Sequence, residues 1–278
     1  MSADMQRAAL IDVDGLHLVA TLQLPSSPGA VGVVFVTGGH QVRAGSHRQF
    51  LRLARGFAAA GYACLRFDLP GLGDSEGALR GFEDNVIALR AAVDLLQKEV
   101  PSIERVVLWG LCDGASAAAL YAPADPRVAG LLLANPWVRT GQVQAKTLVA
   151  SYYRRQMMSW VFWRKVFSGR VGIVHSAREW LRNWRIARQA ADVPGNALPE
   201  RLLEALHAFK GVLRIVIAEY DLTGQEFLQV LGSRADLPCA SLPDADHTFS
   251  SSRDHQRLAE QSLILLGDVA AASSRNPA

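Results

Sequence analysis

The sequence predicts an α/β protein with a mostly parallel central sheet, helices on both faces and a helical insertion. Three observations favour this class. Apolar runs of strand length alternate with stretches of helical periodicity, as in βαβ units. A Gly-x-Cys-x-Gly turn at residues 110–114 joins one such run to an alanine-rich stretch. A segment rich in Trp, Tyr and Arg then interrupts the alternation.

Strands are expected where apolar and β-branched residues follow one another. Residues 16–24 alternate polar and apolar residues loosely, which indicates an early antiparallel strand after residues 8–13. Later runs such as 31–36 are continuous, which is typical of strands buried on both faces. The other predicted strands are 63–68, 105–109, 128–134, 213–218 and 238–242.

Helices are expected between these strands. Apolar residues recur at helical spacing over 46–60, and Gly61 is placed to end that helix. Residues 82–100 predict an amphipathic helix that ends before Pro101. Its predicted apolar face consists of Val86, Leu89, Val93, Leu96 and Val100. The remaining predicted helices are 115–121, 223–231 and 253–266.

The basic, aromatic segment predicts the division of the chain. Residues 139–188 hold eleven basic residues and one acidic residue, a net charge of +10 in a chain whose total is +3. Such a charge break suggests an insertion with its own role. We therefore expect a core formed by residues 1–136 and 210–278, and a helical cap formed by 137–209.

Composition narrows the function. A chain of 278 residues, half of them hydrophobic, can bury a large core. No secretory signal or bilayer-length apolar run is visible, and three widely spaced cysteines make no disulfide framework, which favours the cytoplasm. Cys64 and Cys239 fall in predicted strands and are interpreted as structural. We expect no cofactor, no metal and no nucleic-acid partner.

Cys112 is the predicted nucleophile. A strand, a Gly-x-nucleophile-x-Gly turn and a helix form a nucleophile elbow, here with cysteine in place of the more usual serine. The flanking glycines are needed because the turn is too tight for side chains. A thiol at the start of a helix is favoured as a thiolate by the helix dipole.

Two partners are expected downstream. Folds with such an elbow place an acid after a late strand and a histidine after the last strand. Asp221 and His247 stand at these places, so His247 is the predicted base and Asp221 the residue that orients it. Glu219, Asp244 and Asp246 are the competing carboxylates.

The oxyanion of a tetrahedral intermediate needs backbone donors. One is expected to be the N–H of Asp113, which follows the nucleophile. The other is expected from the loop after the strand at 31–36, where Gly39 is preferred and His40 is the near alternative. The Gly71-Leu72-Gly73 turn is not a dinucleotide loop, because its next glycine falls at position 77 and no helix opens there.

Together these residues resemble the α/β-hydrolases, and more narrowly the hydrolase 1 family associated with exosortase A systems. The resemblance rests on Gly38-Gly39, on residues 43–50, on 66–77 and on 110–116. Pro70 departs from it, because many relatives carry a basic residue there. The family is placed near polysaccharide and acyl-activation functions, so the resemblance implies acyl chemistry without naming a substrate.

The expected reaction is hydrolysis of a small ester or thioester through an acyl-enzyme. One alternative is acyl transfer from a coenzyme A or carrier-protein thioester to an amine or alcohol. Another is a catalytically silent scaffold. The candidate substrate-binding residues are His40, Arg43, Trp137, Trp160 and Trp163. For the loop at 43–48, a helix-capping role of Ser46 is the alternative to substrate contact.

Overall fold

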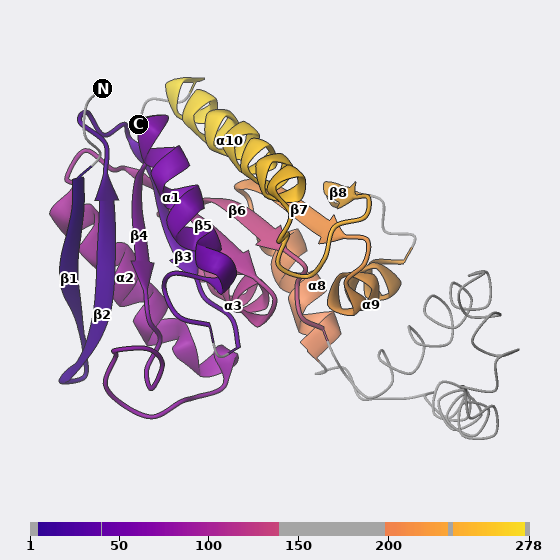
Figure 1. Cartoon of the computed structure of the whole chain (residues 1–278), viewed down its shortest axis with the longest axis horizontal. Coiled ribbons are helices and arrows are strands. Elements are labelled where there is room, and N and C mark those ends of the chain that lie inside the picture. Colours follow the sequence, from indigo (N-terminus) through magenta and orange to yellow (C-terminus); the bar gives the residue numbers. More distant parts are fainter. Residues whose placement is uncertain (1–4, 40, 139–197, 233–235, 276–278) are drawn as a thin grey trace, which may run out of the picture.

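A single sheet of eight strands, in the order β1-β2-β4-β3-β5-β6-β7-β8, organises the described part of the chain (Figure 1). The structure is a computed structural model, and it describes residues 5–39, 41–138, 198–232 and 236–275. The strands are β1 (Met5–Val13), β2 (Leu16–Leu24), β3 (Val31–Val36), β4 (Ala63–Phe67), β5 (Arg105–Leu111), β6 (Val128–Ala134), β7 (Val212–Ala218) and β8 (Cys239–Leu242).

The pairing of the strands places their ends. β1 and β2 form an antiparallel hairpin whose turn residues Asp14 and Gly15 both have positive φ. β2 is antiparallel to β4, and every later pairing is parallel. The carboxyl ends of β3 to β8 therefore meet at one edge of the sheet. The predicted α/β class with a mostly parallel sheet is confirmed.

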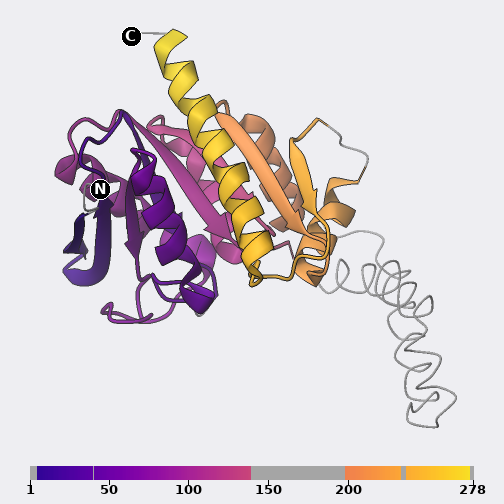
Figure 2. The same ribbon diagram turned by 45° about the horizontal axis from the view of Figure 1, so that its top comes forward.

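Helices cover both faces of the sheet. α1 (Gln49–Ala59) and α10 (Ser252–Arg275) lie together on one face, and Figure 2 shows α10 running across it. α2 (Val86–Glu99), α3 (Asp113–Tyr121) and α8 (Leu198–Ala208) cover the other face. α9 (Leu222–Leu231) follows β7 and packs beside it. Short 3-10 turns at Ser46–Arg48, Phe82–Asn85 and Ala122–Ala124 complete the described elements.

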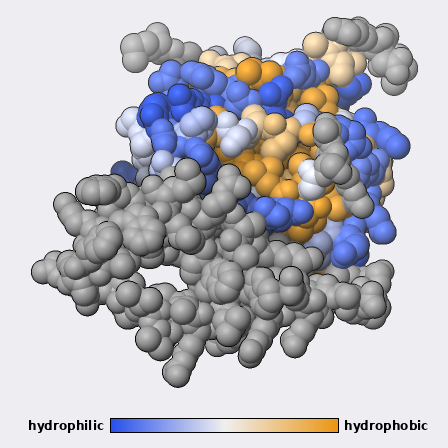
Figure 3. All heavy atoms as spheres, turned by 90° about the vertical axis from the view of Figure 1, so that its right-hand side faces the viewer, coloured by the Kyte–Doolittle hydropathy of each residue, from blue (hydrophilic) through white to orange (hydrophobic). Residues whose placement is uncertain are grey.

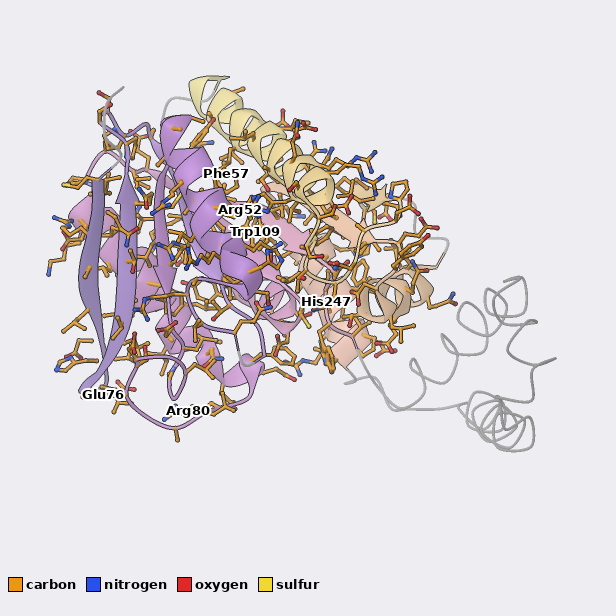
Figure 4. The ribbon with its side chains drawn as sticks, in the orientation of Figure 1. Arg52, Phe57, Glu76, Arg80, Trp109 and His247 are labelled. Carbon is orange, nitrogen blue, oxygen red and sulfur yellow. The ribbon has the colours of Figure 1, made fainter. Side chains whose placement is uncertain are left out.

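A cluster of aromatic side chains packs α1 against β3 and β5 of the sheet. Phe35 of β3 contacts Phe50 and Phe57 of α1, with ring centroids 5.8 and 5.9 Å away, and Trp109 of β5 at 5.4 Å. Figure 4 labels Phe57 and Trp109 beside α1. The Trp109 ring also lies 5.5 Å from that of Phe50 in α1, and its indole N–H donates to the Ser262 hydroxyl of α10 at 3.0 Å, so one side chain ties β5 to both covering helices.

Two helical predictions need correction. The expected helix at 46–60 is broken, because His47 and Arg48 have φ of 42° and 61°, and α1 begins only at Gln49. Ser46 caps nothing, since its hydroxyl accepts from the Gln41 amide instead. Val86, predicted on the buried face of its helix, is 46% exposed.

Most of the predicted cap lies outside the described residues. α8 falls within its expected bounds, but it packs against α3 with Leu202, Leu203 and Leu206 buried in the main core. The division at 137 and 209 stays a prediction. Among the described residues, no helix is both long enough and apolar enough to span a bilayer. On the side of β8 and α9, the described surface has an apolar area bordered by hydrophilic residues (Figure 3).

Candidate active site

The turn between β5 and α3 holds Cys112 in a conformation that side chains rarely adopt, with φ of 61° and ψ of −128°. The positions on either side of Cys112 have room only for glycine. A Cβ on Gly110 would stand 2.5 Å from the Ala115 Cα, and a Cβ on Gly114 would collide with the carbonyl oxygen of Val36. The turn is therefore an elbow whose strain is enforced by close backbone packing.

Backbone hydrogen bonds fix Cys112 further. Its N–H donates to the Ala134 carbonyl at 2.9 Å, and its carbonyl accepts from the N–H groups of Ala115 and Trp137 at 3.0 and 3.2 Å. The side chain itself is half-buried at the first turn of α3. The thiol is thus presented at the N-terminus of α3.

His247 lies in the loop after β8, at the carboxyl edge of the sheet (Figure 4). Its side chain interacts with that of Cys112, and its Nδ1 lies 2.9 Å from Oδ2 of Asp221. That distance suits an ion pair, although the ring N–H does not point along an ideal hydrogen-bond direction. Burial lowers the pKa of His247, but the hydrogen bonds and charges of Asp221 and Cys112 outweigh it and raise this pKa to about 10.

Asp221 is held in place by the start of α9. Its carboxylate accepts from the N–H groups of Thr223 and Gly224 at 3.2 and 3.0 Å, and its side chain is 7% exposed. These donors leave Oδ2 directed at His247 as well. One acidic side chain therefore caps a helix and orients the imidazole.

The competing carboxylates have other partners. Asp244 accepts the Tyr220 hydroxyl at 2.7 Å, and Glu219 accepts the Asp244 N–H. Asp246 accepts from Thr248 and Ser250 and so shapes the loop that carries His247. Among the described residues, no group of three or more His, Cys, Asp and Glu side chains is arranged to hold a metal ion.

Asn135 is a site residue that the sequence interpretation missed. It is fully buried directly after β6, with φ of 46°. Its amide donates to the His247 carbonyl at 3.0 Å and its oxygen accepts the Ala218 N–H at 2.8 Å. One side chain thus ties the ends of β6 and β7 to the histidine loop. The available signal was a polar residue immediately after a buried strand.

The two expected oxyanion donors lie beside the Asp113 carboxylate. This carboxylate accepts the Gly114 N–H at 3.1 Å, and the N–H groups of Gly39 and of Asp113 itself stabilise its charge. A Cβ on the neighbouring Gly38 would collide with this carboxylate. Burial raises the pKa of Asp113 above its usual value, by more than these donors and the charge of His247 lower it.

The structure does not gather the expected substrate-binding residues at one place. Trp137 lies beside the elbow, where its carbonyl accepts the Ser116 hydroxyl at 2.6 Å. The Arg43 guanidinium pairs with Asp68 and, at 2.7 Å, with Asp74, so it joins the loops after β3 and β4. The expected contacts His40, Trp160 and Trp163 lie outside the described residues.

The other two cysteines differ from Cys112. Cys64 is fully buried under α1, and burial raises the pKa of its thiol. Cys239 is exposed at the start of β8. Both lie in strands, as expected. The exposed Cys239 thiol is the natural comparison for any test of Cys112.

Comparison with known proteins supports the same fold. The family described as the Alpha/beta hydrolase family matches residues 33–261. An esterase of Pyrococcus furiosus superposes with a TM-score of 0.64 at 15% identity, covering 95% of this chain and 91% of that one. The α/β-hydrolase GrgF of a Penicillium species gives 0.64 at 17%, covering 96% and 99%. A dienelactone hydrolase of Anabaena variabilis gives 0.61 at 16%, covering 95% and 98%. No curated protein matched.

Proposed function

Because the chain belongs to the α/β-hydrolase family, we propose that it is a cysteine hydrolase that cleaves an ester or thioester through an acyl-enzyme. The observation that carries this proposal is the position of His247. Its side chain interacts with Cys112 and is ion-paired with Asp221, while Cys112 sits on a strained elbow. Nucleophile, base and orienting acid are the parts that covalent acyl transfer requires.

The first half-reaction forms the acyl-enzyme. The Cys112 sulfur attacks the carbonyl carbon, and the carbonyl electron pair moves to oxygen. When the intermediate collapses, the bond to the leaving oxygen or sulfur breaks and protonated His247 gives that atom its proton. The raised pKa of His247 suits this step, because it keeps the imidazole protonated at neutral pH.

The second half-reaction releases the acid. His247 takes a proton from water, whose oxygen attacks the thioester carbonyl. The carbon–sulfur bond then breaks, and Cys112 returns as thiolate. The N–H groups of Gly39 and Asp113 are the proposed oxyanion donors in both halves, and one such donor is worth roughly 10²–10³ in rate.

The substrate is proposed to be a small acyl ester or thioester. Relatives of the same fold include esterases. Trp137, next to the elbow, is the proposed wall of the acyl site, with His40, Trp160 and Trp163 as further contacts. Arg43 is assigned a positioning role, because two carboxylates already hold it. The basic residues at 139–188 favour an anionic leaving group such as coenzyme A or an acyl carrier protein.

The proposal is tested by intact mass after exposure to 4-nitrophenyl acetate and to a panel of acyl thioesters. We expect one acyl group per chain, lost in Cys112→Ala and kept in Cys64→Ala and Cys239→Ala. The Cys239→Ala variant is the matched control, because it removes an exposed thiol outside the site. Acylation at Cys239 alone would contradict the proposal, and absence of acylation with every reagent would favour a scaffold.

A second measurement separates hydrolysis from transfer. The acyl-enzyme is formed, excess reagent is removed, and its decay is followed with and without an added amine or alcohol. A hydrolase releases free acid at a rate that the additive does not change. A faster decay that yields amide or ester would instead show an acyltransferase. The free thiol that both reactions need is consistent with a reducing cytoplasm.

A further inference from the structure

The Asp113 side chain lies where the chemistry would place the substrate's oxyanion. Its carboxylate accepts the Gly114 N–H at 3.1 Å and lies against Gly38, and the N–H groups of both proposed oxyanion donors, Gly39 and Asp113, stabilise its charge. A carboxylate oxygen and a tetrahedral oxyanion are both small anions that need the same donors. The two oxygens therefore compete for one position.

We propose that the Asp113 carboxylate is an internal occupant of the oxyanion hole, held there until a substrate oxygen displaces it. This inference rests on the proposed function, since it assigns a second role to a residue of the same site. Asp113 then acts twice: its N–H stabilises the oxyanion, and its side chain delays access to that N–H. The side chain thereby sets how easily a given substrate reaches the transition state.

The charge of the side chain makes the competition unequal. Hydrogen bonds to an ionised acceptor are about twice as strong as neutral ones. A neutral carbonyl oxygen in the ground state is a weak competitor for donors that already hold a carboxylate. The oxyanion of the transition state is a strong one. Displacement therefore belongs to the chemical step, and its cost is added to the barrier of acylation.

A small cavity beside Asp113 is suited to receive the displaced carboxylate. It has a volume of about 20 Å³, and its lining includes Thr37, Gly39, Asn85, Arg80 and Asp113. Thr37 is 1% exposed, and its hydroxyl has no hydrogen-bond partner in the described structure. A buried hydroxyl without a partner is costly, and a carboxylate that rotates toward it would satisfy it. The Thr37 hydroxyl is thus the proposed second resting place.

The first experiment compares two reactions of Cys112. Acylation by 4-nitrophenyl acetate passes through an oxyanion, whereas alkylation by iodoacetamide does not. The ratio of the two rates corrects for any change in the reactivity of the thiolate. We expect Asp113→Asn, which keeps the shape, and Asp113→Ala to raise this ratio about tenfold or more, within the worth of an oxyanion donor. Asp84→Asn, which neutralises an exposed carboxylate of the adjoining 3-10 turn, should leave it within about twofold.

The outcomes separate this inference from the proposed function. A ratio that is unchanged or lower in both Asp113 variants, with wild-type acylation intact, overturns the competition and leaves the hydrolase standing. A wild-type thiol that is alkylated but is acylated by no reagent, in wild type or variant, overturns both.

The second experiment tests the receiving hydroxyl. Thr37→Val removes the donor at nearly constant volume, so we expect the acylation-to-alkylation ratio to fall about threefold to tenfold, as for one lost hydrogen bond. In the Asp113→Asn background, which has no carboxylate to receive, the same substitution should change the ratio by less than about twofold. Equal effects in both backgrounds would show that the hydroxyl does not receive this carboxylate.

Discussion

On the Cys112 side of the active site, neighbouring backbone leaves no room for a side chain at Gly38, Gly110 or Gly114. On the His247 side, polar contacts do the same work: Asn135 holds the backbone of the loop, and Asp221 holds the ring. Where side chains are excluded, the sequence shows glycines at fixed spacing. Where polar contacts hold the site, the sequence shows no such spacing. The two sides should therefore fail differently when they are mutated.

The largest effect is expected on the polar side, at Asp221. Asp221→Asn should lower the rate of Cys112 acylation by roughly 10⁴, because an amide neither stabilises the imidazolium nor fixes the ring tautomer. The measurement is single-turnover acylation, followed by mass. Asp244→Asn is the matched control, because Asp244 is an exposed carboxylate of the His247 loop, and it should cost less than about tenfold. Equal losses in the two variants would remove Asp221 from its assigned role.

Asn135 tests the same side through stability. Asn135→Ala leaves the Ala218 N–H and the His247 carbonyl without partners, and each such buried group costs about 1–3 kcal/mol. We expect a loss of about 2–4 kcal/mol in the free energy of unfolding, measured with urea, together with slower acylation.

A second substitution at Asn135 separates the loss of the hydrogen bonds from the strain of an alanine in this backbone conformation. Asn135→Gly removes the same hydrogen bonds but tolerates the φ of 46°, so it should be about 1 kcal/mol more stable than Asn135→Ala. Wild-type stability in Asn135→Ala would show that the Asn135 amide does not hold the His247 loop to β7.

The steric side is tested at Gly114. A methyl group there meets the backbone of Val36 and Thr37, and overpacking of this kind costs about 1–3 kcal/mol. Urea unfolding should detect the loss, and the thiol should become accessible to bulky reagents as the elbow shifts. Gly56→Ala is the control: among the described residues, no atom beyond the helix's own backbone would lie within 4 Å of a Cβ there, so helix propensity should add about 0.5–1 kcal/mol. Gly114→Ala with unchanged stability would contradict the steric account.

This difference between the two sides also explains what could be predicted from the sequence. The elbow was visible, because sterics demand glycine at fixed spacing around Cys112. Strand and helix positions followed from apolar periodicity, and the chain order placed Asp221 and His247. Asn135 was missed because its partners are backbone groups 83 and 112 residues away. The left-handed His47 and Arg48, which break the predicted helix, were missed because tertiary contacts override local propensity.

The position of the Asp113 carboxylate escaped sequence interpretation for a related reason. A Gly-x-Cys-Asp-Gly string predicts an N–H donor at Asp113, since every residue in that position has one. It does not predict where the carboxylate turns. That direction depends on Gly38, in the loop after β3, because a Cβ there would collide with the carboxylate.

The smallest expected effect is the pH dependence that His247 gives to stability. Its pKa rises from 6.5 to about 10 in the folded protein, so the folded state binds the proton more tightly than the unfolded state. This contribution is complete below pH 6.5 and is lost as pH rises through about 10. Because the side chain is 36% exposed, solvent screening limits it to on the order of 1 kcal/mol.

The measurement compares wild type with His247→Gln by urea unfolding at several pH values from 6 to 10. Groups that do not interact with His247 titrate alike in both proteins and cancel in the difference. The stability advantage of wild type should shrink steadily across this range. An advantage that stays constant would mean that the ring gains no proton affinity on folding, and that Asp221 and Cys112 do not hold it as an imidazolium.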